Sequence, residues 1–191
     1  MKYFYEFFFL SISYNKEENV KTIAFFSGYY LPHTGGVERY VYNIATRLQK
    51  QGIRVIIVTT KHDTSLPSIE QTREAKIYRL PIYQLFSARY PIIKKNKEYR
   101  NLIEQLKNEK IEYCILNARF WLTSLVGAKF SKQQQIPNCL VEHGSSHFTV
   151  YNKILDFFGE KYEHWLTNQI KKYVTDFYRS IRGMLQMART F

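Results

Sequence analysis

The amino-acid sequence predicts an α/β fold: a Rossmann-like, doubly wound and mostly parallel sheet. Three observations predict it. Short apolar runs typical of buried strands alternate with segments of helical period. One strand, one helix and a second strand follow each other within residues 22–60, as in a βαβ unit. Two adjacent glycines, in the stretch GYYLPHTGGVERYVYN, mark the first strand-to-helix turn.

The first βαβ unit is the clearest part of the pattern. TIAFFS, residues 22–27, has the apolar character of a buried strand. A helix begins near Gly36, because apolar residues then recur every three or four positions, and Gly52 ends it. IRVIIVTT, residues 53–60, is the second strand. Since a helix connects these two strands, they are expected to lie parallel.

The alternation continues to residue 178, so residues 21–178 are predicted to form one domain. Further strands are predicted at residues 75–82, 112–117, 137–144 and 173–178, and further helices at 93–110, 121–135 and 153–172. Residues 1–20 are predicted to form an N-terminal extension, and a weak signal peptide is the alternative. Their apolar stretch is far shorter than the roughly 20 residues that span a bilayer. Residues 179–191 are predicted to form an atypical C-terminal tail.

Composition favours a basic, cytoplasmic protein. The formal net charge of +12 predicts contact with an anionic partner, either nucleic acid, a phosphorylated small molecule or an acidic membrane surface. Cys114 and Cys139 stand in apolar runs without C-x-x-C spacing, which is typical of buried free thiols in a reducing compartment. The five histidines do not combine with cysteine at zinc-ligand spacing, so we expect no metal.

The paired glycines Gly35 and Gly36 have a physical interpretation. A helix N-terminus points free N–H groups and its positive dipole end at the carboxyl edge of a parallel sheet, where anions and phosphates bind. Residues without side chains would let such a ligand approach the backbone. The alternative is a tight turn that holds no ligand. Glu38 follows within the first helical turn and is a candidate for substrate contact. The alternative is a purely structural role, because a carboxylate is favourable at a helix N-terminus.

The stretch GYYLPHTGGVERYVYNIATRLQKQGIRVIIVTT resembles the opening of the retaining glycosyltransferases of family 4. Their GT-B architecture has two Rossmann-like domains that face each other. The matching positions are Pro32, Gly35, Gly36, Glu38, Leu48 and Gly52. The resemblance implies that Gly35 and Gly36 line the cleft beside the donor's diphosphate. It also implies a nucleotide-sugar donor, a glycan or lipid-linked acceptor, and chemistry that needs no metal or other cofactor.

A second group of polar residues follows later predicted strands. In VEHGSSHF, His143 directly follows an apolar strand, and the family resemblance implies that this histidine contacts the transferred sugar. A histidine satisfied within a loop is the alternative. Gly144 would let the backbone turn away, and Ser145 would cap the next segment or touch substrate. Asn117 and Arg119 lie past the end of another strand, where both are candidates for substrate contact and Arg119 for binding an anion.

Residues 93–110 combine basic and aromatic or aliphatic side chains. The basic members are Lys94, Lys95, Lys97, Arg100, Lys107 and Lys110. By resemblance to family members with lipid-linked acceptors, this segment predicts peripheral docking on the inner face of an anionic membrane; a solvated helix face is the alternative. Nucleic-acid binding is not expected, because no recognisable reader motif accompanies the charge.

The family's second, donor-binding domain carries two glutamates eight positions apart. Glu104 and Glu112 have this spacing, but they lie in the first domain and are rejected for that role. The resemblance stops after Tyr178, so we interpret the chain as a truncated or frameshifted acceptor-side half with little transferase activity. The alternative function is a non-catalytic phosphate- or nucleotide-binding module, or the subunit of a split transferase completed by a separate donor domain.

Overall fold

The computed structural model describes residues 22–83, 90–143 and 153–179, and it confirms the predicted α/β fold. A seven-stranded sheet has the order β3-β4-β2-β1-β7-β8-β9, with six parallel strands and β3 antiparallel at one edge. The strands are β1 (Thr22–Phe26), β2 (Arg54–Thr60), β3 (Ile69–Gln71), β4 (Lys76–Leu80), β7 (Tyr113–Asn117), β8 (Asn138–Glu142) and β9 (Asp176–Arg179). The helices are α2 (Gly36–Lys50), α3 (Lys97–Lys107), α4 (Leu122–Gln133) and α5 (Lys153–Lys171).

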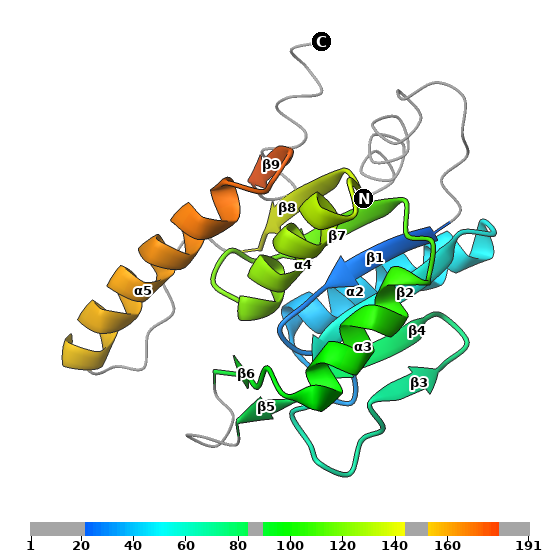
Figure 1. The fold of residues 1–191 in the computed structure, drawn as a ribbon, viewed down its shortest axis with the longest axis horizontal. Coiled ribbons are helices and arrows are strands. Elements are labelled where there is room, and N and C mark those ends of the chain that lie inside the picture. The colour runs from blue at the N-terminus through cyan, green and yellow to red at the C-terminus, as the bar shows by residue number, and fades with distance from the viewer. Residues whose placement is uncertain (1–21, 84–89, 144–152, 180–191) are drawn as a thin grey trace.

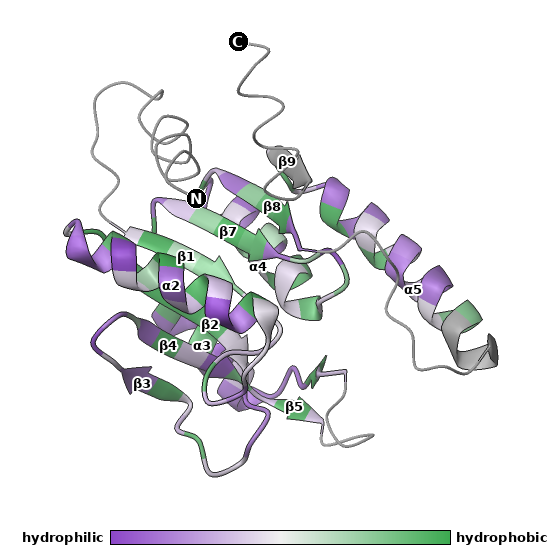
Figure 2. Ribbon diagram, turned by 180° about the vertical axis from the view of Figure 1, so that it is seen from behind, coloured by the Kyte–Doolittle hydropathy of each residue, from purple (hydrophilic) through white to green (hydrophobic). Residues whose placement is uncertain are grey.

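Helices cover both faces of the sheet, as a doubly wound fold requires (Figure 1). Alternate residues of the central strand β1 point to opposite faces: Ile23 and Phe25 pack with the α2 side, whereas Ala24 and Phe26 pack with the α3, α4 and α5 side. Figure 2 shows α2 lying across its face of the sheet, with hydrophilic residues along its outer surface. The two apolar cores explain why the strands read as continuous hydrophobic runs.

The two cysteines belong to these separate cores. Cys114 packs on the α3, α4 and α5 side and Cys139 on the α2 side, and both thiols are buried and free. The predicted buried free thiols are therefore confirmed. Burial raises the pKa of the Cys114 thiol, which keeps that sulfur protonated and unreactive.

The order of the strands places a topological switch point at the centre of the sheet. From β1 the chain moves outward to β2 and β4, then returns to the other side of β1 to form β7, β8 and β9. The carboxyl ends of β1 and β7, at Phe26 and Asn117, are therefore neighbours from which the chain leaves in opposite directions. In open α/β sheets, ligands bind at this position.

Two local predictions need correction. Helix α3 begins at Lys97 rather than at residue 93, because Asn96 caps it by accepting a hydrogen bond from the backbone N–H of Tyr99 at 3.0 Å. Ile92–Ile93 instead forms β6, which pairs antiparallel with β5 (Ile82–Tyr83). The strand predicted at 75–82 is divided, since Pro81 cannot donate to a ladder.

Strand β3 was not predicted at all. It is three residues long and only partly buried at the sheet edge, so it carries no apolar pattern. The predicted extension 1–20, residues 180–191 of the predicted tail, and Gly144 and Ser145 lie outside the described residues.

Candidate functional site

The switch point gathers polar and aromatic residues from the ends of several strands. Ala118, directly after β7, is fully buried and has a φ of 64°, a left-handed conformation that is uncommon outside glycine. Its amide donates to the carbonyl of Val141 at 2.8 Å, and its carbonyl accepts from Ser124 Oγ at 2.7 Å. These hydrogen bonds stabilise a sharp turn at Ala118, so the chain changes direction directly after Asn117.

The two paired glycines have different surroundings. Gly35 is the N-cap of α2, and a Cβ added there would collide with the carboxylate of Glu38. A Cβ added to Gly36 would meet no atom within 4 Å. Gly35 therefore makes room for the protein's own Glu38, whereas Gly36 stands beside open space at the start of the helix, where backbone N–H groups have no intrahelical partner.

Glu38 is buried within the first turn of α2 and has a structural role there. Its carboxylate lies 3.6 Å from Nδ1 of His33. The negative charge is favourable beside the positive end of the helix. Burial, together with the nearby Glu38, raises the pKa of Tyr29 to about 12. A phosphate bound to this helix N-terminus would have a carboxylate as neighbour, which restricts it to the open side at Gly36.

His143 and Asn117 are brought together, although 26 positions separate them in the sequence. Nε2 of His143 lies 2.9 Å from Oδ1 of Asn117, and the ring of Tyr40, from α2, packs edge-on against the imidazole with centroids 4.6 Å apart. Asn117 is fully buried, and its Nδ2 donates to the carbonyl of Phe26 at 3.3 Å. Burial lowers the pKa of His143 to about 4, so its ring is neutral at neutral pH.

Arg119 has partners within the protein. Its guanidinium lies 3.0 Å from Oε2 of Glu142 and 3.7 Å from Oε2 of Glu163. Its backbone N–H donates to Glu142 as well, at 3.2 Å. The side chain is 18% exposed, and these carboxylates already neutralise its charge. Arg119 thereby ties α5 to the ends of β7 and β8; its predicted contact with a substrate anion stays a prediction.

An aromatic cluster at the switch point was not found from the sequence. Tyr29 stacks on His33 with centroids 4.4 Å apart and meets the edges of His62 and Trp121 at 5.7 and 5.3 Å. Tyr90 stacks on Trp121 at 5.4 Å. The sequence offered one indication of this cluster, because three of its members follow closely after predicted strands: His33, His62 and Trp121. Trp121 also lies against the backbone of Gly28, where a Cβ would collide with the indole.

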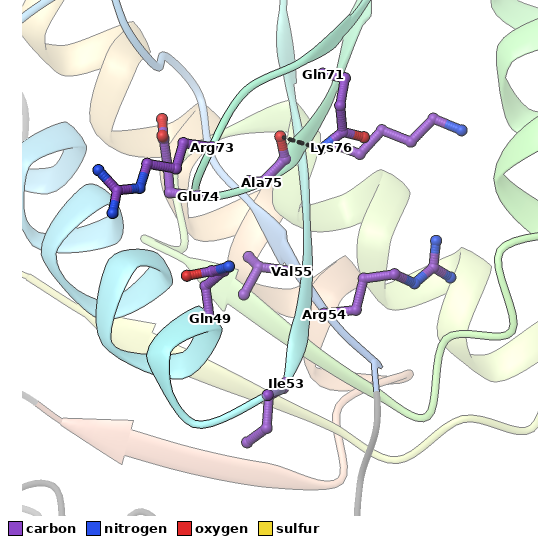
Figure 3. A pocket seen from close by; sticks show the side chains of 10 residues that line it. Gln49, Ile53, Arg54, Val55, Gln71, Arg73, Glu74, Ala75 and Lys76 are labelled. Atoms are coloured by element: carbon purple, nitrogen blue, oxygen red, sulfur yellow. Dashed lines mark hydrogen bonds between the residues drawn. The ribbon is translucent and has the colours of Figure 1, made fainter.

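A separate cavity of about 290 Å³ lies at the opposite, amino-terminal edge of the sheet (Figure 3). Gln49 at the end of α2 and Val55 and Ala75 at the strand starts contribute to its lining, together with Arg54 and Lys76. These last two side chains bind Glu109, at 2.5 and 2.6 Å. The cavity therefore does not coincide with the switch point, and Arg73 and Glu74 also contribute to its lining.

Within the described ranges, no three histidine, cysteine or acidic side chains are placed together to hold a metal ion. None of the described helices combines the length and the apolar character needed to cross a bilayer.

Comparison with known proteins gives the same fold and a family. Sucrose-phosphate synthase from Thermosynechococcus elongatus matches with a TM-score of 0.51 and 18% identity, over 75% of this chain and 40% of that one. CalG4, the calicheamicin glycosyltransferase, matches with a TM-score of 0.44 and 12% identity, over 82% of this chain and 43% of that one. No curated protein matches significantly.

The chain thus spans about two-fifths of the length of these solved structures. The described fold resembles part of the sucrose-phosphate synthase structure. The profile named Glycosyltransferase Family 4 matches residues 34–178, which include Gly35, Gly36, Asn117 and His143. The chain therefore belongs to glycosyltransferase family 4.

Proposed function

We propose that this chain is the acceptor-side domain of a retaining glycosyltransferase that moves a sugar from a nucleotide-sugar donor to a glycan. The observation that carries the proposal is the meeting of two features at one edge of the sheet. Open space faces the helix N-terminus at Gly36, and the neutral His143, which follows strand β8, packs against Tyr40 of the same helix. The acceptor would be lipid-linked, in the synthesis of a surface polysaccharide.

Each feature supports one part of the chemistry. Backbone N–H groups at the start of α2 would bind the diphosphate of the donor, whose charge the helix dipole favours. His143 would orient the transferred sugar by a hydrogen bond. Because the ring is neutral at neutral pH, it fits this positioning role better than that of a cationic acid. The chain's own groups supply these interactions without a cofactor.

A two-domain transferase places donor and acceptor in reacting geometry when its domains close. In this proposal the chain forms one side of such a cleft, and its coverage of 40% of sucrose-phosphate synthase supports assigning it to part of a larger enzyme. We therefore expect little or no sugar transfer by the 191-residue chain alone. Mixing it with a separately produced donor domain is expected to restore transfer if the enzyme is a split one.

Donor binding can be tested with a pair of glycine variants. We expect Gly36→Leu to weaken binding of UDP-glucose or GDP-mannose at least tenfold, because the leucine side chain would fill the open space at the helix N-terminus. Gly159→Leu is the matched control, since a Cβ at Gly159, on α5, also meets nothing within 4 Å. NMR titration of the ¹⁵N-labelled chain measures both. Equal binding by the two variants, or no saturable binding of either nucleotide sugar by the unsubstituted chain, would contradict the proposal.

We also propose that the domain docks on an anionic membrane through β5, β6 and the start of α3. Tyr83 and Ile92 are 47% and 38% exposed on this hairpin, and the ammonium of Lys94 lies 5.8 Å from the centroid of the Tyr83 ring. Lys95 and Lys97 are exposed beside them. A surface of aromatic, aliphatic and basic side chains suits the interface of an acidic bilayer, in which a lipid-linked acceptor would be held.

A further inference from the structure

We propose that Asn117 is a positioning residue: it fixes the tautomer and ring orientation of His143 and leaves His143 Nδ1 as the hydrogen-bond acceptor. Asn117 would then act on the substrate through His143 and not by touching it. The inference rests on the proposed function for the substrate that Nδ1 meets, but the hydrogen bond and the tautomer stand independently of that function.

The orientation of the Asn117 amide follows from its two partners. The carbonyl of Phe26 can only accept, so the group that faces it at 3.3 Å must be the Nδ2 amide. The amide oxygen then faces Nε2 of His143 at 2.9 Å. The reversed orientation would set two oxygen acceptors against each other inside the protein, where an unmade hydrogen bond is destabilising. Since Oδ1 can only accept, the proton lies on Nε2.

The surroundings hold this arrangement from several elements. Asn117 is fully buried at the end of β7, and its carbonyl accepts from Ser124 Oγ, in α4, at 3.0 Å. Tyr40, in α2, packs edge-on against the imidazole. Asn117 thus lies between the end of β1 and the ring of His143, and it has no freedom to turn without losing a buried hydrogen bond.

The tautomer decides which chemical group His143 can recognise. With the proton on Nε2 and the ring neutral, Nδ1 is an acceptor on the side of the ring that points away from Asn117. An acceptor binds a hydroxyl group and disfavours a phosphate oxygen, which is itself an acceptor. His143 is therefore assigned to a sugar hydroxyl, and the phosphates are left to the N-terminus of α2.

Nitrogen NMR tests the tautomer directly. In the chain labelled with ¹⁵N-histidine, at about pH 7.5, we expect a protonated Nε2 and an unprotonated Nδ1 for His143, assigned by their loss in His143→Gln. The Nε2–H is expected to be protected from exchange with water. Asn117→Leu should abolish that protected signal. Asn117→Asp should keep it and raise the pKa of His143 by about one pH unit or more, because the ring then faces a carboxylate.

Asn138→Leu is the matched control. Asn138 is equally an asparagine buried at a strand end, and its amide donates to Ser131 Oγ and the carbonyl of Tyr173, far along the strand from His143. It should leave the His143 signals unchanged. A protonated Nδ1 in the unsubstituted chain, or a protected Nε2–H that survives Asn117→Leu, would overturn the proposal. If Asn117→Leu does not fold, the tautomer of His143 in the unsubstituted chain and the pKa of His143 in Asn117→Asp still test the proposal.

Adding UDP-glucose separates this inference from the function on which it partly rests. The expected result is a shift of the His143 Nδ1 signal as the sugar hydroxyl donates to it. An unprotonated Nδ1 that UDP-glucose and GDP-mannose both leave unmoved would count against the proposed function, while the positioning role of Asn117 would stand.

Discussion

At the scale of single residues, the state of His143 follows from its burial. Burial lowers its pKa from the ordinary value of 6.5 to about 4, so the unfolded chain binds more protons than the folded chain between these values. Above about pH 6.5 this ring does not change the free energy of unfolding, and as the pH falls toward 4 the free energy of unfolding decreases because the unfolded chain takes up the proton first. Between about pH 7.5 and 5, we expect the free energy of unfolding to decrease by about 1–2 kcal/mol less in His143→Gln than in the unsubstituted chain.

Urea unfolding at the two pH values measures this difference. His164→Gln is the control, because the His164 side chain on α5 is 63% exposed. The control should show the same acid dependence as the unsubstituted chain. If His143→Gln does so too, the ring is protonated at its ordinary pKa and the neutral state derived from burial is wrong.

Glu109 changes the free energy of unfolding at a lower pH than His143 does. Burial disfavours its charge, but hydrogen bonds from Lys76, Tyr78 and Arg54 outweigh burial and lower its pKa from 4.5 to about 2. Its stabilisation is therefore complete above about pH 4.5 and is lost as the pH falls toward 2. We expect Glu109→Gln to reduce the free energy of unfolding at neutral pH by about 2–3 kcal/mol, since two cations lose their carboxylate partner.

A second glutamate near the end of α3 provides the comparison for Glu109. Glu104 pairs with Lys107 at 2.7 Å, but its side chain is 68% exposed. Exposed pairs contribute little, so Glu104→Gln is expected to change the free energy of unfolding by less than about 0.5 kcal/mol in urea titrations. Similar losses for the two variants would mean that the cluster around Glu109 is no stronger than a surface ion pair.

At the scale of elements, the approach of α4 to the sheet depends on Gly127. A Cβ at this position would stand 2.5 Å from Cγ of Phe26 and 2.6 Å from Cδ2 of Leu116. We expect Gly127→Ala to lower the free energy of unfolding by about 1–3 kcal/mol, because the helix must move off the sheet. Gly159→Ala, on α5 with free space around it, should instead raise it by up to about 1 kcal/mol. Thermal unfolding of both variants checks the opposite signs.

The elements that the sequence predicted are those with a clear apolar pattern. β1 and β2 are continuous apolar runs, α2 repeats its apolar residues every three or four positions, and the strand ends then place Asn117 and His143 at one edge. β3 and the β5–β6 hairpin are too short to show any period. Their formation depends on partners far along the chain, such as the pairing of Ile69 with Tyr78.

The candidate site was predictable in position but not in its contacts. The sequence placed Gly35 and Gly36 together as a ligand site, whereas only the three-dimensional contacts show that Glu38 occupies the space beside Gly35. In the same way, nothing in the sequence pairs Arg119 with Glu142 and Glu163. Such contacts depend on where the side chains point in three dimensions, and a one-dimensional pattern contains no information on which side chains meet.

At the scale of the whole molecule, the net charge of +12 predicts an anionic partner. The membrane proposal places part of that charge on the surface formed by β5, β6 and the start of α3. The exposed Lys94 and Lys95 lie beside the exposed Tyr83 and Ile92. Each basic residue near an acidic bilayer contributes about 1 kcal/mol of binding free energy. Reversing two charges there should therefore weaken binding to vesicles much more than reversing two charges elsewhere on the molecule.

The variant Lys94→Glu/Lys95→Glu is expected to bind vesicles of phosphatidylglycerol and phosphatidylcholine at least tenfold more weakly than the unsubstituted chain in a flotation assay. Lys171→Glu/Lys172→Glu makes the same change in net charge with exposed lysines at the end of α5, and it should retain most of the binding. Binding should also fall when phosphatidylglycerol is omitted, because the attraction is electrostatic. Equal losses in the two variants would show that binding follows total charge without a docking surface. Retention on DNA that is stronger than on vesicles and falls steeply with salt would assign the charge to nucleic acid instead.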